Sequence, residues 1–91
     1  MKRKVQFFYA GYGGKPVYVH GYLTDEGGGR LLFEVTASEP EPRPKPGLYG
    51  PGDLPGGWMT LMPEPDRDTR ALDQTVLQAA RAAGFPLREG T

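Results

Sequence analysis

Residues 17–24 read Val-Tyr-Val-His-Gly-Tyr-Leu-Thr, and their side chains alternate in character with a period of two. One side of an extended chain carries the aliphatic members and the glycine of this stretch. The other side carries the polar and aromatic members, which are Tyr18, His20, Tyr22 and Thr24. Successive side chains of a β-strand point to opposite faces of the sheet, so the alternation predicts a strand half-buried against a core. We expect this strand over about residues 16–24.

The same period of two recurs on both sides of this stretch. It predicts strands over about residues 3–10 and 30–38, with apolar faces made of Val5, Phe7 and Tyr9 and of Leu31, Phe33, Val35 and Ala37. The links at residues 11–14 and 25–29 are short and rich in glycine. Links of this length suit hairpins and are too short for a helical crossover, so the sequence predicts an antiparallel meander.

The apolar faces restrict how these strands pair, because a slip of one residue turns every side chain to the other face. The following register is one that is consistent with the apolar faces. It pairs Phe7 with Val19, Phe8 with Tyr18, Val19 with Val35, Gly21 with Phe33 and His20 with Glu34.

Residues 39–57 interrupt the pattern with six prolines and five glycines in 19 positions. The alternating prolines of residues 39–46 favour extended or polyproline-II geometry over roughly 25 Å. We expect residues 39–57 to form one long loop, which is unusual in a small domain and is either functional or mobile. A short fourth strand is expected over about residues 58–62. The pattern does not identify which face of this strand is buried, because both of its sides are apolar.

A helix is predicted over about residues 68–83. Asp66 and Asp68 are candidate N-caps, and Gly84 can take the left-handed position that ends a helix before Pro86. The apolar stripe of this helix consists of Leu72, Val76, Ala79, Ala80 and Ala83. The sequence therefore predicts an α+β fold. It has a meander of three to four strands, one C-terminal helix on the apolar face, and a long Pro/Gly-rich loop before the last strand.

Length and composition limit the protein to one small domain over residues 1–91, since 37% of its residues are hydrophobic. Eleven basic residues balance eleven acidic ones, so no strong overall field attracts nucleic acid or an anionic membrane. The basic N-terminus lacks the apolar run of a signal peptide, and no stretch is long enough to span a membrane. We expect a cytoplasmic protein that does not contact membranes. The absence of Ile, Asn and Cys resembles a heat-adapted composition, which a GC-rich genome also produces.

Catalytic and metal-binding residues are scarce, because the chain has no cysteine, one histidine and one serine. The candidate ligands would be His20, Glu34, Asp66, Asp68 and Asp73, whose spacing matches neither an EF-hand nor a His-x-x-x-His pair. His20 beside Glu34 is better explained as a polar cross-strand pair than as a catalytic one. We therefore expect no enzymatic activity, no metal and no cofactor.

The second face of the meander is the most informative surface. It would bring together Phe8, Tyr18, His20, Tyr22, Leu32 and Glu34. So much aromatic surface is usually covered by something. Three covers fit: the proline-rich loop of the same chain, a second copy or another protein, or single-stranded nucleic acid whose phosphates would contact Lys2, Arg3 and Lys4. The leading hypothesis is an interaction module that binds itself or another protein, and the alternative is a binder of single-stranded nucleic acid.

Overall fold

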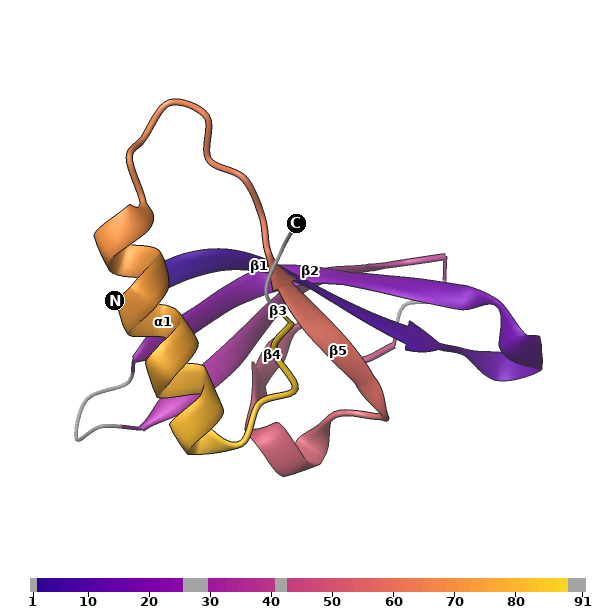
Figure 1. Ribbon diagram of the computed structural model, residues 1–91. Coiled ribbons are helices and arrows are strands. Elements are labelled where there is room, and N and C mark those ends of the chain that lie inside the picture. Colours follow the sequence, from indigo (N-terminus) through magenta and orange to yellow (C-terminus); the bar gives the residue numbers. More distant parts are fainter. Residues whose placement is uncertain (1, 26–29, 41–42, 89–91) are drawn as a thin grey trace.

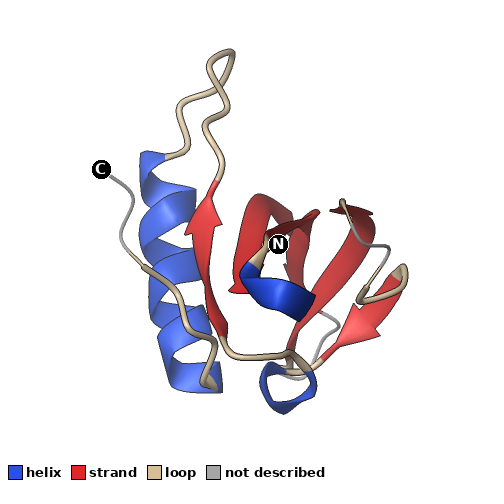
Figure 2. Cartoon of the chain, turned by 90° about the vertical axis from the view of Figure 1, so that its right-hand side faces the viewer, coloured by secondary structure: helices blue, strands red, loops and turns tan. Residues whose placement is uncertain are grey.

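The computed structural model describes residues 2–25, 30–40 and 43–88. One antiparallel sheet, in the strand order β4-β3-β2-β1-β5, carries α1 along one of its sides (Figures 1 and 2). The fold is α+β with a C-terminal helix, as predicted. The elements are β1 (Lys2–Ala10), β2 (Pro16–Asp25), β3 (Leu31–Glu39), β4 (Gly47–Tyr49), β5 (Gly57–Leu61) and α1 (Arg70–Ala83), with 3₁₀ turns at Tyr12–Gly14 and Pro51–Asp53.

The pairing of β1 with β2 has the predicted register, since Phe7 lies opposite Val19 and Phe8 opposite Tyr18. β5 pairs antiparallel with the other edge of β1, so β1 is an interior strand of the sheet. Met59 of β5 lies opposite Phe7 and is fully buried, whereas Trp58 lies opposite Phe8 on the other face. The structure thus decides which face of β5 enters the core.

The predicted register of β2 with β3 is wrong along the whole pair, because β3 is shifted by two residues, so that Val35 lies opposite Gly21 where Phe33 was expected. His20 lies opposite Ala37 while Gly21 lies opposite Val35, so β3 contains one extra residue, Thr36, at a β-bulge. The Thr36 hydroxyl donates a hydrogen bond to the His20 carbonyl oxygen at 2.9 Å. The correct pairs include Val19 with Ser38, Tyr22 with Glu34 and Leu23 with Phe33. The alternation of residues 31–38 is uninterrupted and shows no sign of the bulge.

One consequence follows from the bulge: Ala37, expected on the apolar face, is exposed on the other face. The predicted pair of His20 with Glu34 is wrong for another reason, since the two-residue shift sets Glu34 opposite Tyr22. The bulge stands beside Gly21, where a Cβ atom would lie 1.9 Å from the Glu34 carbonyl oxygen. Only a residue without a side chain allows the two backbones to approach this closely.

Residues 39–57 do not form a single loop. Within them β4 pairs with β3, placing Tyr49 opposite Phe33 and Leu48 opposite Glu34. The peptide bonds before Pro40 and Pro44 are cis. The Tyr9 hydroxyl donates to the Arg43 carbonyl at 2.7 Å, and the Ser38 hydroxyl donates to the Pro44 carbonyl at 2.9 Å. The described part of residues 39–46 therefore turns back against the ends of β1 and β3 instead of extending as an arm, while residues 41–42 lie outside the described residues.

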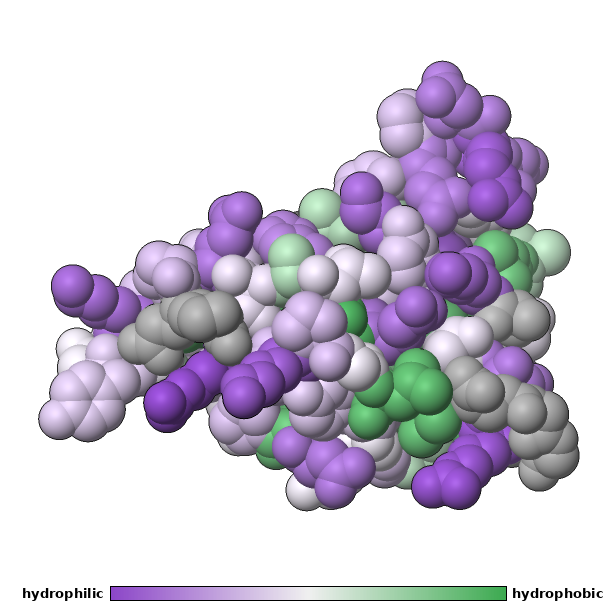
Figure 3. Space-filling view, turned by 180° about the vertical axis from the view of Figure 1, so that it is seen from behind, coloured by the Kyte–Doolittle hydropathy of each residue, from purple (hydrophilic) through white to green (hydrophobic). Residues whose placement is uncertain are grey.

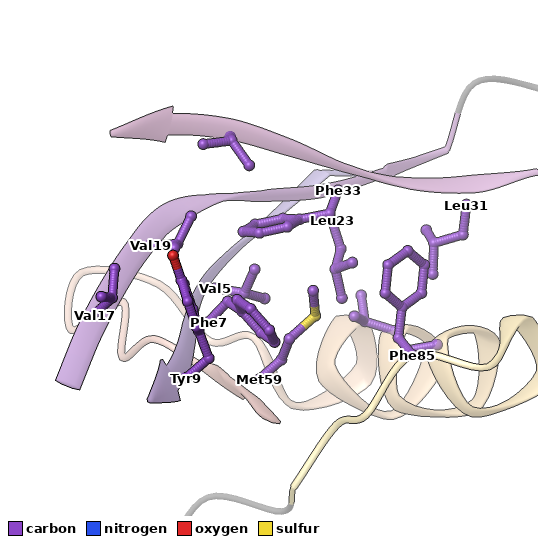
Figure 4. Close-up of a cluster of buried hydrophobic side chains, with 13 residues drawn as sticks. Val5, Phe7, Tyr9, Val17, Val19, Leu23, Leu31, Phe33, Met59 and Phe85 are labelled. Carbon is purple, nitrogen blue, oxygen red and sulfur yellow. The ribbon is translucent and has the colours of Figure 1, made fainter. Parts of the chain in front are cut away.

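The core lies between the sheet and α1 (Figure 4). The helix begins at Arg70, two residues later than predicted, with Thr69 at its N-cap position. Asp68 still accepts a hydrogen bond from the Arg70 amide at 3.2 Å, and Gly84 ends the helix with φ 93° as predicted. The buried hydrophobic residues are Val5, Phe7, Tyr9, Val17, Val19, Leu23, Leu31, Phe33, Val35, Met59, Val76, Ala80 and Phe85.

The segment after α1 returns to the outer edge of β5. The Met59 amide donates to the Pro86 carbonyl at 2.8 Å, and the Arg88 amide donates to the Met59 carbonyl at 2.9 Å. These bonds form a parallel bridge between Met59 and Leu87, which occupies backbone groups that an edge strand would otherwise leave free. In the described part of the chain, no helix has the length and apolarity needed to cross a membrane.

Candidate functional site

The candidate site is the face of the sheet opposite α1, across which no helix or strand of the described chain lies (Figures 1 and 2). Figure 3 views the molecule from behind and shows a surface on which polar and apolar side chains are mixed. We call the surface formed by the side chains on this face of the sheet the aromatic face. Its residues include Lys2, Lys4, Gln6 and Phe8 of β1, Tyr18, His20 and Tyr22 of β2, Leu32, Glu34, Ala37 and Glu39 of β3, Leu48 of β4, and Trp58 of β5.

A row of three aromatic rings crosses β2, β1 and β5. The Phe8 ring centroid lies 5.2 Å from that of Tyr18 and 4.3 Å from that of Trp58. Tyr18 is 39% exposed, whereas Phe8 and Trp58 are half-buried. The Arg88 guanidinium carbon lies 4.2 Å from the Trp58 ring centroid, within the range of a cation–π contact. This row is therefore a continuous apolar strip with a cation at one end.

A second row crosses β3, β2 and β1, where Glu34 lies opposite Tyr22 and Tyr22 lies opposite Lys4. Lys2 also reaches this row, because its Nζ lies 4.6 Å from the Tyr22 ring centroid and 3.6 Å from Glu34 Oε2. Both side chains of that ion pair are substantially exposed, so its contribution to stability is small.

The charges on the aromatic face are segregated on either side of β2. The acidic residues Glu34 and Glu39 lie on β3. The basic residues lie on β1 and beside β5, and they are Lys2, Lys4 and Arg88. Between them, β2 contributes Tyr18, His20 and Tyr22. The strands of this face therefore carry acidic residues on one side of an aromatic centre and basic residues on the other, while Glu64 and Asp66 of the β5–α1 loop line the same hollow as Lys4 and Tyr22.

The structure places all six residues predicted for this face on one side of the sheet: Phe8, Tyr18, His20, Tyr22, Leu32 and Glu34. Sequence analysis missed Leu48, Trp58 and Arg88, and Leu48 was missed because β4 lies within the segment expected to be a loop. Trp58 could not be assigned because both sides of its strand are apolar. Arg88 reaches the face only because the backbone after α1 pairs with β5.

Arg3, grouped with Lys2 and Lys4 in the sequence, lies on the other face of the sheet and is only 2% exposed. Its Nε donates to Asp73 Oδ1 at 2.6 Å, and its Nη1 donates to the Met62 carbonyl at 2.6 Å. Nη1 also lies 3.3 Å from Glu64 Oε1. Arg3 thus connects β1 to the β5–α1 loop and to α1, away from the aromatic face.

Beside Arg3 a shallow cleft of about 570 Å³ lies between α1 and the segment before it, and both Arg3 and Asp73 line it. The hydrogen bond from Arg3 holds the pKa of the Asp73 carboxyl below its ordinary value of 3.8, and a hydrogen bond from Thr69 adds to the effect. The charges of Arg3 and Asp73 neutralise each other, and the pair joins β1 to α1. This structural role accounts for the presence of both groups beside the cleft.

The described residues contain no group of three or more His, Cys, Asp or Glu side chains that could hold a metal ion. The chain shows no significant match to any model of a known protein family, to any curated protein sequence or to any solved structure.

Proposed function

We propose that this protein is a small non-enzymatic binding module of the cytoplasm that binds a protein surface through its aromatic face. The observation that carries the proposal is the row of Tyr18, Phe8 and Trp58, whose rings contact one another on the side of the sheet opposite α1. Tryptophan, tyrosine and arginine are the residues that most often dominate the binding energy of protein interfaces. Arg88 on Trp58 adds the third type to this surface.

The distribution of charge supports a protein partner over a polyanion. Glu34 and Glu39 occupy one side of the face, where they would repel the phosphates of a nucleic acid. Mixed charges around an aromatic centre are typical of a protein interface, in which the rim is polar.

The double variant Tyr18→Ala/Tyr22→Ala tests the proposal. We expect it to lose self-association in light scattering and to lose partner proteins retained by the tagged wild-type chain. The matched control is Tyr12→Ala, because Tyr12 is 92% exposed and lies in the β1–β2 turn away from the face. If the double variant folds and keeps both the mass and the partners of the wild type, the proposed function is wrong.

Single-stranded nucleic acid is the second candidate, favoured by the two cations that lie over aromatic rings of this face. Bases would stack on Phe8, Tyr18 and Trp58 while Lys2 and Lys4 contacted phosphates. A titration with a fluorescent oligonucleotide at about 50 mM salt tests this, since phosphate contacts are strongest at low salt. Binding that disappears in Lys2→Ala/Lys4→Ala would favour this candidate, whereas no binding at low salt would remove it.

A further inference from the structure

We infer that the partner of the aromatic face is a second copy of this chain, packed face to face about a two-fold axis that runs along β2. This inference rests on the proposed function and names its partner. It starts from the segregation of charge, in which β2 separates the acidic residues of β3 from the basic residues of β1 and the β5 edge.

A two-fold axis along β2 exchanges the two sides of the face while keeping each residue at its level along the strands. The axis therefore places β1 of one copy over β3 of the other. In the row of Glu34, Tyr22 and Lys4, it sets each lysine against the partner copy's glutamate and the two tyrosines against each other. One arrangement thus forms two opposite-charge contacts and brings no like charges together in this row.

The other row has the same polarity. Glu39 lies on β3 at the level of Tyr18, and Arg88 lies over Trp58 on the far side of Phe8. Because the axis sets β3 over β1, it places Glu39 over the other copy's Phe8, one strand short of Trp58 and Arg88, and brings the exposed Tyr18 side chains near the axis. A two-fold interface requires a surface complementary to itself, and the row of Glu34, Tyr22 and Lys4 meets that requirement in its charges.

The packing geometry is that of a β-sandwich. Two sheets packed face to face keep their strand directions within about 30° of each other, as they do when the axis runs along a strand. The aromatic rings would then form the centre of the interface and the charged pairs its rim.

Charge reversal tests the inference, using Lys4→Glu, Glu34→Lys and the double variant that carries both. Each single change sets like charges against each other twice in the dimer, so we expect the dimer to weaken about tenfold or more. The double variant exchanges the two charges and restores both contacts, so we expect its association to return to near the wild-type level. Lys15→Glu is the matched control, because it makes the same change of charge at an exposed site outside the face.

Two measurements report the association of each variant, and circular dichroism verifies that every variant is folded. Light scattering over about a hundredfold range of concentration gives the mass, which mass action makes concentration-dependent. Trp58 is the only tryptophan of the chain and lies on this face, so its emission reports directly on contact there. We expect the emission to shift to shorter wavelength as the dimer forms.

A wild-type chain that stays monomeric over the whole range overturns the inference. The inference is also wrong if neither charge reversal weakens the dimer, or if the double variant associates no better than the single variants. If the chain is monomeric and yet loses a different protein partner in Tyr18→Ala/Tyr22→Ala, the proposed function stands and only the identity of the partner is wrong. If the wild-type chain neither self-associates nor retains a partner protein that Tyr18→Ala/Tyr22→Ala loses, the proposed function is rejected as well.

Discussion

Arg3 Nε lies 2.6 Å from Asp73 Oδ1, so one ion pair joins the first strand to the first helical turns across 70 positions of sequence. The guanidinium is almost fully buried, while the carboxylate side chain is 29% exposed. Nη1 of the same guanidinium binds the Met62 carbonyl and lies close to Glu64. Arg3 therefore fixes both the helix and the loop that leads into it against β1.

Replacing Arg3 should destabilise the whole domain. In Arg3→Ala, the Met62 carbonyl and the two carboxylates lose their buried donor. We expect a loss of about 2 kcal/mol in the free energy of unfolding, below the usual cost of breaking a fully buried pair because the carboxylates can be rehydrated. Urea unfolding followed by circular dichroism measures it. The control is Arg70→Ala, whose exposed side chain should matter by less than about 0.5 kcal/mol.

The lowered pKa of Asp73 predicts a specific dependence of stability on pH. Because the pKa is lower in the folded chain than in the unfolded one, the ionised carboxylate stabilises the fold above the ordinary value of 3.8. That contribution is lost as the pH falls below 3.8 and through the folded-state pKa. The stability advantage of the wild type over Asp73→Asn should therefore shrink on acidification. An advantage that stays constant down to about pH 3 would contradict this origin.

Gly21 should not tolerate a methyl group. The Cβ atom of Gly21→Ala would lie 1.9 Å from the Glu34 carbonyl oxygen, a backbone atom that cannot move without breaking the β2–β3 ladder. We expect a loss of at least about 2 kcal/mol, or no folded protein. Gly52→Ala is the control, because nothing lies within 4 Å of the Cβ position there. Equal unfolding midpoints for the two variants would disprove the close approach at the bulge.

The neighbours Trp58 and Met59 should differ in what their truncation impairs, because Met59 lies in the core and Trp58 lies on the aromatic face. Met59→Ala opens a cavity in the core and should lower the free energy of unfolding by about 3 kcal/mol. Trp58→Ala removes ring contacts at a partly exposed site and should cost about 1 kcal/mol in stability. The same change should weaken association through the aromatic face, which Met59→Val should leave intact. Thermal unfolding and light scattering separate the two effects.

Much of the architecture could be predicted because it depends on local pattern. Alternation around Val19 and Phe7 identified two strands and their shared face, and the register predicted for them from the apolar faces is the one that the structure has. The left-handed Gly84 was predictable for a similar reason, since a glycine after a helical stripe and before Pro86 has few other uses.

The β2–β3 register could not be predicted in the same way, because a shift of two residues keeps both apolar faces together and leaves the alternation unchanged. One extra residue at Thr36 reverses the faces of everything beyond it in β3, and nothing in the alternation of residues 31–38 marks that position. The bulge depends on Gly21, a residue of the neighbouring strand.

The sequence by itself determined the strands with one apolar side, the helix with its stripe, and the gathering of Phe8, Tyr18 and Tyr22 on one face. These properties follow from the direction in which successive side chains point. Only the tertiary structure decided that Arg3 is buried, that Trp58 extends the aromatic row, and that Glu34 faces Tyr22 in place of His20. Each of these depends on groups distant in the sequence, whose positions are fixed only when the strands and the helix pack together.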